Sequence, residues 1–600
     1  MLDERTYQHK KAEETIWAID FVKKIYEIDD PAVRYRNLTA ITDLRDMMYK
    51  SAEKFADRVC FMDKKKRGGD YFEITYREML EQVNGLGTKF IDLGLKDKRI
   101  VIIGENSHKW AETYLAAVCG TGVIVPIDKM LSKEEILPLV KASEASAVVF
   151  DEVFEEIFRN MRDSGETNLE VLISMQGKKH DDVLLFDEVR AEGIKLASEG
   201  DRRFLDAQVV NDVMSVLLFT SGTTGSPKGV MLSHKNLAAD LMAAPAIIKV
   251  GPEDRFFSFL PMHHTYECTE GFLMPIYRGS SVAYCEGLRY IVKNLEEAQP
   301  TIFLCVPAVL ESLSKKIWQT ARKSGKEKLL RNALKINRVT KKVKLDIGSI
   351  AFKDIRKLFG GRMRLLITGG AAINPEILDT LNEFGVMAIQ GYGMTECAPL
   401  GALNPDYKFK AASIGRHLPN FDAKIDNIGE DGLGEICVKG ENVMMGYYNS
   451  PDLTAEVIDE EGWLHTGDLG YMDEEGYIFI TGRAKNVIIT KNGENVYPEE
   501  LEYYLSLNPW IQESMVWEKP NQEGDDTLIF ASVKLDDEEF ANAFGEKTDA
   551  EKEAIIWKAC EEANKILPYY KRIKGSMMRK EEFEKNSSKK IKRFAESNRQ

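Results

Sequence analysis

Residues 220–229 constrain the fold most strongly, because they place a glycine-rich turn directly after a short apolar segment. The apolar residues 216–219 predict a buried strand. Behind them, Ser and Thr hydroxyls alternate with Gly222 and Gly225 as far as Lys228. Glycines let a backbone approach a ligand closely, hydroxyls donate to phosphate oxygens, and a lysine adds positive charge. The stretch therefore predicts a loop that grips phosphate, with a polar turn between two elements as the alternative.

Two details separate this stretch from the ordinary nucleotide-binding loop. Pro227 interrupts it, and the Gly-Lys-Ser/Thr ending is missing. The order Thr-Ser-Gly-Thr-Thr-Gly-Ser-Pro-Lys-Gly-Val instead resembles the signature loop of the AMP-forming adenylating enzymes, which include acyl-CoA synthetases, luciferases and peptide-synthetase adenylation domains. The resemblance implies that the loop binds ATP through Thr220, Ser221, Gly222, Thr223, Thr224, Gly225 and Lys228.

Length and composition are compatible with such an enzyme. A chain of 600 residues predicts several domains or subdomains. The net charge of −15 argues against nucleic acid as a partner. We find no apolar run of eighteen residues and no signal peptide, so we expect a cytoplasmic protein. The eight cysteines lie far apart, without a Cys-x-x-Cys pair, which predicts reduced core cysteines rather than a zinc site.

The order of apolar segments predicts the fold class. Residues 99–104 form an apolar run, residues 108–119 have helical character, and residues 122–126 are apolar again. This alternation indicates parallel strands joined by crossover helices, an α/β fold. Segments 104–107 and 125–127 also resemble the N-terminal subdomain of acyl-CoA synthetases.

The resemblance implies a division into domains. We predict a large N-terminal domain of stacked α/β subdomains over residues 1–482 and a small, mobile α+β domain over residues 483–600. Residues 1–40 are expected to form a helical extension of the large domain. Lys485 matches the hinge position about which the small domain of the family rotates.

A basic segment at residues 315–344 departs from the acidic character of the chain. It holds twelve Lys or Arg residues against the single acid Glu327. The helical spacing of its apolar residues, Leu329, Leu330, Leu334, Ile336 and Val339, predicts an amphipathic helical insertion. Either this is a solvated helix face, or it is a patch that contacts anionic lipid and holds the protein peripherally at a membrane.

A pair of histidines follows another apolar segment, at residues 256–260. His263 and His264 stand in the order Leu-Pro-Met-His-His-Thr-Tyr-Glu, where an imidazole can lie between a carboxylate and the α-phosphate. From the residues alone, either histidine is equally well a loop or core residue. The resemblance assigns His264 to the junction of the acyl and nucleotide pockets.

Two further strand ends carry glycines, which is where open parallel sheets hold ligands. Small residues leave room for a flat base, Tyr392 can stack on it, and Glu396 can hold a magnesium ion that bridges phosphates. The family gives these roles to the matching positions, with Thr220 as the second contact to Mg²⁺. The predicted nucleotide-binding residues are Gly369, Gly370, Ala371, Gln390, Gly391, Tyr392, Gly393 and Thr395.

The remaining predicted site residues lie towards the C-terminus. Asp468, in a Trp-x-x-Thr-Gly-Asp sequence, resembles the carboxylate that accepts hydrogen bonds from both ribose hydroxyls. Arg483 is expected to reach the ribose or the phosphate. Alignment of Lys-Ile-Lys-Arg at residues 590–593 with the family's ending assigns the adenylation lysine to Lys590, although Lys589 and Glu584 replace the usual Gly and Pro, so Lys589 stays an alternative.

Together these motifs imply an acyl-CoA synthetase, most like the long-chain type, over roughly residues 40–600. We expect it to convert a medium- or long-chain fatty acid into an acyl-adenylate with ATP and Mg²⁺, and then to transfer the acyl group to CoA. The expected catalytic residues are Lys590, Glu396, His264 and Lys228. One alternative acceptor is the phosphopantetheine of an acyl carrier protein. Another alternative is a catalytically silent nucleotide-binding scaffold.

Overall fold

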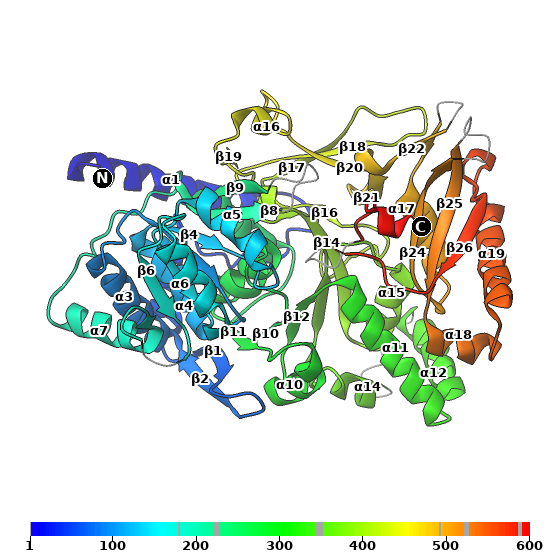
Figure 1. Ribbon diagram of the computed structural model, residues 1–600, viewed down its shortest axis with the longest axis horizontal. Coiled ribbons are helices and arrows are strands. Elements are labelled where there is room, and N and C mark those ends of the chain that lie inside the picture. The colour runs from blue at the N-terminus through cyan, green and yellow to red at the C-terminus, as the bar shows by residue number, and fades with distance from the viewer. Residues whose placement is uncertain are drawn as a thin grey trace. The chain divides into compact units, whose positions relative to one another are not determined.

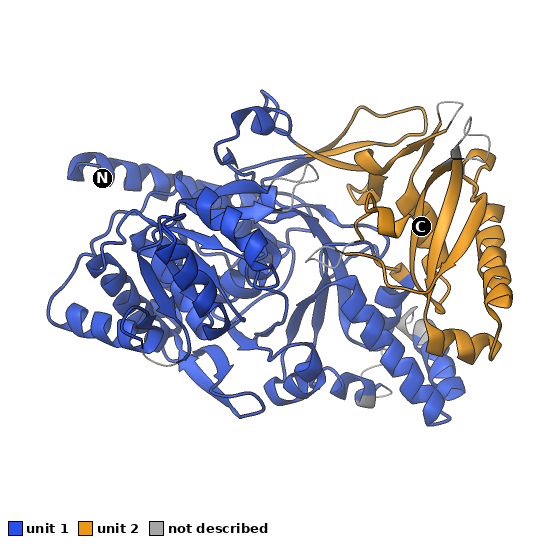
Figure 2. Cartoon of the chain, viewed as in Figure 1, with its two compact units in different colours: residues 1–372, 376–423, 438–464 blue, residues 373–375, 424–437, 465–600 orange. Residues whose placement is uncertain are grey.

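The computed structural model describes residues 2–177, 180–220, 227–342, 352–490, 494–520, 527–585 and 591–599. The chain divides into two compact units (Figure 1 and Figure 2). Unit 1 holds residues 1–372, 376–423 and 438–464, and unit 2 holds residues 373–375, 424–437 and 465–600.

One sheet of unit 1 has the strand order β16-β15-β14-β13-β12-β10-β11-β1-β2. The strands from β14 to β1 in this order run parallel, while β2, β15 and β16 pair antiparallel at the two edges. The strands are β1 (Val59–Lys64), β2 (Tyr71–Thr75), β10 (Arg255–Ser258), β11 (Ser281–Tyr284), β12 (Ile302–Cys305), β13 (Leu365–Thr368), β14 (Met387–Gly393), β15 (Leu400–Leu403) and β16 (Arg416–His417).

The other large sheet of unit 1 has the order β19-β9-β8-β4-β3-β5-β6-β7. Successive residues of its strand β3 point into two different cores: Ile100 and Ile102 join one cluster, and Val101 and Ile103 join the other. Both faces are therefore covered, as expected for parallel strands with crossover helices. The strands are β3 (Arg99–Ile103), β4 (Val123–Pro126), β5 (Ala147–Phe150), β6 (Val171–Ser174), β7 (Leu184–Leu185), β8 (Met214–Thr220), β9 (Lys228–Ser233) and β19 (Gly446–Tyr447).

The helices of unit 1 begin at residues suited to cap them. Thr75 and Glu78 form a capping box at the start of α3, and the Ser107 hydroxyl accepts from the Trp110 N–H at the start of α4. The helices are α1 (Glu4–Glu27), α2 (Leu44–Phe55), α3 (Tyr76–Asp92), α4 (His108–Ala116), α5 (Lys133–Ser143), α6 (Glu155–Asp163), α7 (Phe186–Ser198), α8 (His234–Ala243), α9 (Met274–Arg278), α10 (Ile291–Ala298), α11 (Pro307–Lys323), α12 (Glu327–Lys342), α14 (Lys353–Lys357), α15 (Pro375–Glu383) and α16 (Pro451–Ala455).

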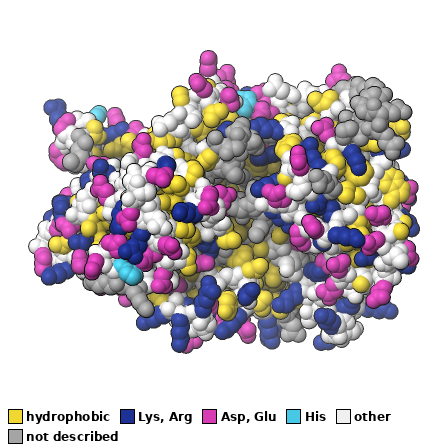
Figure 3. Space-filling view, in the orientation of Figure 1, with side chains coloured by type: hydrophobic (Ala, Val, Ile, Leu, Met, Phe, Trp, Pro, Cys, Tyr) yellow, Lys and Arg dark blue, Asp and Glu magenta, His cyan; other side chains and the backbone are white. Residues whose placement is uncertain are grey.

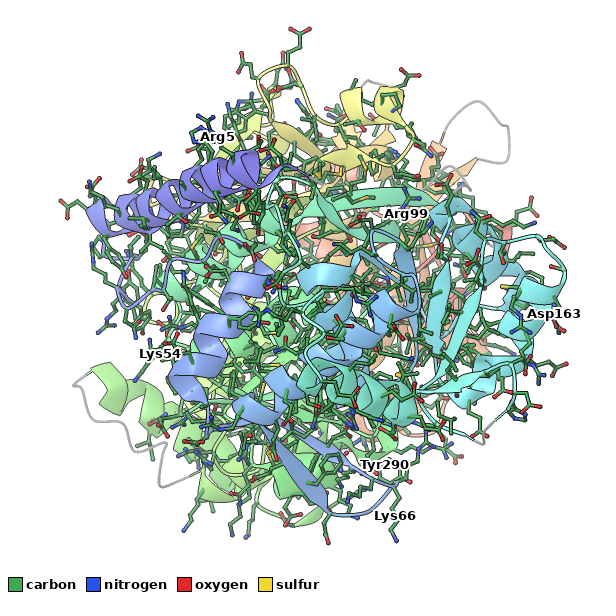
Figure 4. All side chains as sticks on the ribbon, turned by 90° about the vertical axis from the view of Figure 1, so that its left-hand side faces the viewer. Arg5, Lys54, Lys66, Arg99, Asp163 and Tyr290 are labelled. Carbon is green, nitrogen blue, oxygen red and sulfur yellow. The ribbon has the colours of Figure 1, made fainter. Side chains whose placement is uncertain are left out.

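The N-terminal helix α1 is fixed to the rest of unit 1 by a buried ion-pair group. Lys11 Nζ lies 2.6 Å from Glu14 and 2.7 Å from Asp43, which caps α2. The two anions hold the pKa of Lys11 above its ordinary value despite burial. Figure 4 shows this side of unit 1, with Arg5 on α1 and Lys54 near the end of α2. The expected N-terminal helical extension is thus a packed part of unit 1.

The predicted basic helical insertion consists of the end of α11 and the whole of α12, separated at Gly325, where φ is +67°. Contrary to the predicted amphipathic pattern, the apolar residues of this segment do not all face the core. Leu334 is buried, but Leu329 and Ile336 are 68% and 54% exposed. Those two residues are spaced by seven positions and lie on a second, solvent-facing stripe.

Lys and Arg side chains recur along the lower margin of the face shown in Figure 3, where α10, α14 and α12 lie in Figure 1. Contact of this segment with lipid stays a prediction. Among the described residues, no helix combines the length and the apolar character that a membrane crossing requires.

Unit 2 is built from small sheets and a few helices, with antiparallel pairs β20–β21, β22–β23 and β24–β25 and a parallel pair β25–β26. Its core gathers Val496, Leu501 and Ile556 with residues of β24 and β25. The sheets have the orders β17-β18-β20-β21, β22-β23 and β24-β25-β26. The elements are β17 (Asp422–Asp426), β18 (Gly434–Lys439), β20 (Leu464–Met472), β21 (Ile478–Arg483), β22 (Ile488–Ile489), β23 (Asn495–Val496), α17 (Pro498–Ser506), β24 (Ile511–Pro520), β25 (Thr527–Leu535), α18 (Asp537–Phe544), α19 (Asp549–Ile566) and β26 (Gly575–Arg579).

The predicted α/β class with a large N-terminal and a small α+β C-terminal part is confirmed by these two units. The predicted boundary after residue 482 and the hinge at Lys485 stay predictions.

Helices α3 and α7 approach so closely that only glycine fits at their crossing. A Cβ on Gly193 would lie 1.8 Å from the Gly85 carbonyl oxygen, and a Cβ on Gly85 would lie 2.4 Å from the Ile194 side chain. Neither contact is sterically possible without moving a helix.

We therefore expect Gly193→Ala to lower the free energy of unfolding by about 1–3 kcal/mol, because overpacking a tight crossing forces the helices apart. Gly251→Ala is the matched control, since a Cβ at Gly251 meets no atom within 4 Å. Urea unfolding of both variants measures the difference. Equal midpoints for the two variants would contradict the account of this crossing.

Candidate functional site

The two ends of the predicted phosphate loop are held together by strand pairing. Thr220 ends β8, Lys228 begins β9, and the two residues are opposite each other in the antiparallel register. Ser221, Gly222, Thr223, Thr224 and Gly225, which lie between them, fall outside the described residues. The register nevertheless fixes the start and the end of this loop at one place.

Tyr447 joins Lys228 to Glu396. It lies on β19, which pairs with β9 next to the loop. The Lys228 ammonium stands 4.9 Å from the centre of the Tyr447 ring, and the Tyr447 hydroxyl donates to Glu396 Oε1 at 2.8 Å. Burial and the Glu396 charge raise the pKa of Tyr447, so its phenol keeps its proton and orients the carboxylate. Four residues from separate segments thus meet: Thr220, Lys228, Glu396 and Tyr447.

The glycine-bearing strand ends lie side by side. Thr368 at the end of β13 pairs with Gln390 of β14, which brings Gly369, Gly370 and Ala371 beside residues 390–393. Gln390 donates to the Ala411 carbonyl oxygen at 2.8 Å. Gly370 and Ala371 are exposed, and residues 391–396, among them Gly391, Tyr392, Gly393 and Thr395, are half-buried.

Some of these glycines are required by space. A Cβ on Gly393 would lie 1.9 Å from the Pro399 carbonyl oxygen. Gly370 has a φ of +82°, which favours glycine, and no atom lies within 4 Å of its Cβ position. Gly370 therefore leaves open space at the carboxyl end of β13, whereas Gly393 is required by close packing against the Pro399 backbone.

The two predicted histidines occupy one loop with different surroundings. Their ring centres are 4.3 Å apart. His263 lies 3.6 Å from Asp128, and burial together with His264 holds its pKa well below the ordinary value, so it is neutral. His264 is half-buried and comes directly before the helical turns that begin at Tyr266.

Asn106 fixes the loop that carries these histidines. Its amide nitrogen donates to the Leu260 carbonyl oxygen at 2.7 Å and to the Ser258 hydroxyl at 3.0 Å, and its amide oxygen accepts from the Met262 N–H. The side chain thus ties the end of β3 to the end of β10. Sequence reasoning noted residues 104–107 only as a resemblance and missed this role.

Tyr447 was also missed. The signal that could have found it is the Gly446-Tyr447-Tyr448 sequence, an aromatic pair directly after a glycine. Tyr448 anchors the neighbouring strands: the Arg99 guanidinium, labelled in Figure 4, lies 4.6 Å from its ring centre, and its hydroxyl donates to Glu144 at 3.2 Å.

In unit 2, the predicted ribose carboxylate and the predicted arginine form a pair. Asp468 of β20 is opposite Arg483 at the end of β21, and Arg483 Nε donates to Asp468 Oδ1 at 2.6 Å. The Asp468 side chain is buried, whereas half of the Arg483 side chain is exposed. Lys485 lies in the short helical turn that follows.

Lys589 and Lys590 fall outside the described residues, but the segments on both sides of them are fixed within unit 2. Lys585 pairs with Ile591 across an isolated antiparallel bridge, and Lys585 Nζ lies 2.7 Å from Glu513. Arg593 forms an ion pair with the half-buried Glu502. The loop that contains both lysines therefore begins and ends at anchored residues.

Residues 48–448 match the family described as AMP-binding enzyme. The chain belongs to the AMP-binding enzyme family. The match covers the predicted phosphate loop, the histidine pair, both glycine-bearing strand ends and Glu396.

The chain is also similar to proteins named as CoA ligases. Long-chain-fatty-acid–CoA ligase 1 of Homo sapiens is 28% identical over 523 residues, which are 81% of this chain and 73% of the relative. Long-chain-fatty-acid–CoA ligase 5 of Rattus norvegicus is 29% identical over 479 residues, or 75% and 69% of the two chains.

Among solved structures, the anthranilate CoA ligase AuaEII in complex with anthranoyl-AMP shares the fold at a TM-score of 0.74 and 20% identity, covering 92% of this chain and 96% of that one. ATP-bound MatB from Rhodopseudomonas palustris has a TM-score of 0.69 and 24% identity, with 92% and 97% covered.

Three buried carboxyl groups lie in the helical segments near the histidine loop. Glu267 and Glu270 belong to the turns that begin at Tyr266, and Asp240 belongs to α8. Burial raises the pKa of Glu267 to about 8. Burial likewise raises the pKa of Asp240 and that of Glu270, and the negative charge of Glu270 adds to the rise at Asp240. Burial therefore disfavours two negative charges on this pair.

We expect this arrangement to make the fold less stable as pH rises. Because the pKa of Glu267 is higher in the folded than in the unfolded state, its contribution is complete below about pH 4.3 and is lost as pH rises through about 8. Glu267→Gln removes this titration, so its free energy of unfolding should fall less between pH 6 and pH 8.5 than that of the wild type.

Urea unfolding at the two pH values measures this difference, with Glu474→Gln in an exposed turn as the control. If Glu267→Gln and the wild type lost the same stability over this range, Glu267 would not be the protonated group.

Proposed function

We propose that this chain is an ATP-dependent ligase that joins a carboxylic acid to the thiol of CoA through an acyl-adenylate, releasing pyrophosphate and AMP. A medium- or long-chain fatty acid is the proposed acid. Membership of the AMP-binding enzyme family supports the adenylation chemistry. The names of the relatives at 28–29% identity support a fatty acid and CoA as the substrates.

The observation that carries the proposal is the group of Lys228, Tyr447 and Glu396 beside the ends of the glycine-rich loop. It puts a cation and a carboxylate at the place where the loop would hold phosphates. The Lys228 ammonium would attract the triphosphate of ATP. The Glu396 carboxylate would repel phosphate oxygens and would instead bind a metal ion.

The residues present fit a magnesium ion. Magnesium prefers hard oxygen donors, and the Thr220 hydroxyl and the Glu396 carboxylate are such donors. Tyr447 fixes Glu396 through Oε1, and Oε2 takes no part in that hydrogen bond. When bound, the ion supplies positive charge that offsets the charge of the phosphate oxygens.

The strand-end residues and the Asp468–Arg483 pair are proposed to bind the rest of the nucleotide. The open space at Gly370, beside the exposed Ala371, leaves room for the flat base, and Tyr392 supplies an aromatic face. The buried Asp468 keeps its carboxylate in one orientation through Arg483, which suits it to accept from ribose hydroxyls.

The proposed reaction has two steps, and neither requires a protein nucleophile. In the first step an oxygen of the carboxylate attacks the α-phosphorus of ATP, the bond to the β-phosphate breaks, and pyrophosphate leaves. In the second step the CoA thiol gives up its proton and attacks the acyl carbon, and AMP leaves. Lys228, Lys590 and His264 are proposed to lower the repulsion between anions in the first step.

An acyl carrier protein is the alternative acceptor, because its phosphopantetheine presents the same thiol. A silent nucleotide-binding scaffold is disfavoured, since Lys228, Glu396, Asp468 and Arg483 are all present and lie in ordered contacts.

We expect Glu396→Ala to reduce ATP–pyrophosphate exchange by about 100-fold or more, because it removes charge stabilisation from the transition state and little packing. Circular dichroism checks the fold, and Glu461→Ala in an exposed turn is the control. Exchange within about threefold of the wild type would remove Glu396 from the proposed chemistry.

Lys590→Ala and Lys485→Pro should impair different half-reactions. Lys590→Ala removes a charge used before pyrophosphate departs, so it should slow pyrophosphate release and spare thioester formation from supplied acyl-adenylate. Lys485→Pro restricts φ near −65° at the proposed hinge and should do the reverse.

Lys589→Ala is the control for the alignment of this loop. If it loses adenylation and Lys590→Ala does not, the adenylation lysine is Lys589. Equal loss of both half-reactions in the Lys590 and Lys485 variants would contradict a two-conformation enzyme.

A further inference from the structure

Three adjacent strands of unit 2 bring an aspartate, a cysteine and a histidine together. Asp426 ends β17, Cys437 lies on β18 and His465 lies on β20, with β18 between the other two. Each residue offers one potential ligand atom, and these atoms all lie within 4.8 Å of one another. The juxtaposition arises from the order of the strands in the sheet, since each residue comes from a different strand.

The donor set has the chemistry of a zinc site. Thiolate, imidazole and carboxylate are the ligands that Zn²⁺ takes in proteins. With bonds of about 2.3 Å to sulfur and about 2.0 Å to nitrogen, a tetrahedral ion separates these two atoms by about 3.5 Å. Cys437 Sγ stands 3.4 Å from His465 Nδ1, so this pair needs almost no movement to bind an ion.

The surroundings allow an ion to enter and leave. Cys437 is buried, whereas the side chains of Asp426 and His465 are 35% and 25% exposed. Glu435, two residues before Cys437 on β18, lies 2.9 Å from His465 Nδ1. Because this carboxylate faces the same imidazole nitrogen as Cys437, an ion bound to Nδ1 would replace the hydrogen bond between His465 and Glu435.

The cluster is linked to the residues beside Asp468. The Gly467 N–H donates to Glu435 Oε1 at 2.8 Å, and the Thr466 hydroxyl donates to the Ile436 carbonyl oxygen at 2.7 Å. The strand that supplies Cys437 and Glu435 therefore also positions the turn before the proposed ribose carboxylate.

We propose that Asp426, Cys437 and His465 form a binding site for a divalent transition-metal ion of the zinc class, distinct from the magnesium ion proposed at Thr220 and Glu396. The contrasting possibility is a network of hydrogen bonds that binds no ion. The two possibilities differ in one respect: only a metal site forms a bond between the ion and the Cys437 sulfur.

Cobalt(II) is the probe for this bond, because a tetrahedral thiolate complex gives a sulfur-to-cobalt charge-transfer band and visible d–d bands. The untagged full chain, freed of metal with a chelator, is titrated with Co²⁺ and then with Zn²⁺. We expect saturable cobalt bands that Zn²⁺ abolishes. Cys437→Ser should lose the charge-transfer band, and Asp426→Asn should weaken Co²⁺ binding about tenfold or more.

Cys285→Ser is the matched control, because Cys285 is a half-buried cysteine outside the cluster, and its bands should equal those of the wild type. Asp426 is a partly exposed strand end, so Asp426→Asn gives a reading even if Cys437→Ser fails to fold. Absent cobalt bands, or bands unchanged in Cys437→Ser and Asp426→Asn, would overturn the proposal.

Discussion

The hydrogen bond from Tyr447 to Glu396 is the contact on which the proposed chemistry depends. Tyr447 reaches both Glu396 and the Lys228 ammonium, and it is held by pairing of β19 with β9. Because β9 also pairs with β8, the same backbone register fixes Thr220 opposite Lys228. The rigid sheet thus positions a cation, a carboxylate and a hydroxyl before any ligand binds, which lowers the cost of binding a polyanion.

Much of this arrangement can be predicted from the sequence, because most of the site residues lie at the ends of strands. The apolar runs before Gly222, Gly369 and Gly391 predict buried strands, and parallel strands place their carboxyl ends at one edge. Tyr447 could not be predicted in the same way, since its strand is two residues long and pairs with a segment over two hundred residues away. The exposed Leu329 and Ile336 show a second limit, because helical periodicity does not say which of two apolar stripes is covered.

Buried ionisable groups divide into two kinds in this protein. Lys11, with Glu14 and Asp43, retains its charge because opposite charges lie within hydrogen-bond distance. Glu267 is buried, and neither of its carboxylate oxygens has a hydrogen-bond partner among the described residues, so burial favours its neutral form. Sequence reasoning could not separate the two kinds, because the partners come from different elements. This difference bears on the proposed function. Glu267 lies in the helical turns that follow His264, and in its neutral form it does not attract a cation.

The most direct test of the central claim is pyrophosphate release by the wild-type protein with ATP, magnesium and carboxylic acids of graded chain length, with and without CoA. The account predicts release that depends on a medium- or long-chain fatty acid, and formation of acyl-CoA and AMP when CoA is added. Two results would contradict it. Release with no carboxylic acid would rule out the proposed acid activation, and acyl transfer to an acyl carrier protein but not to CoA would rule out the proposed acceptor.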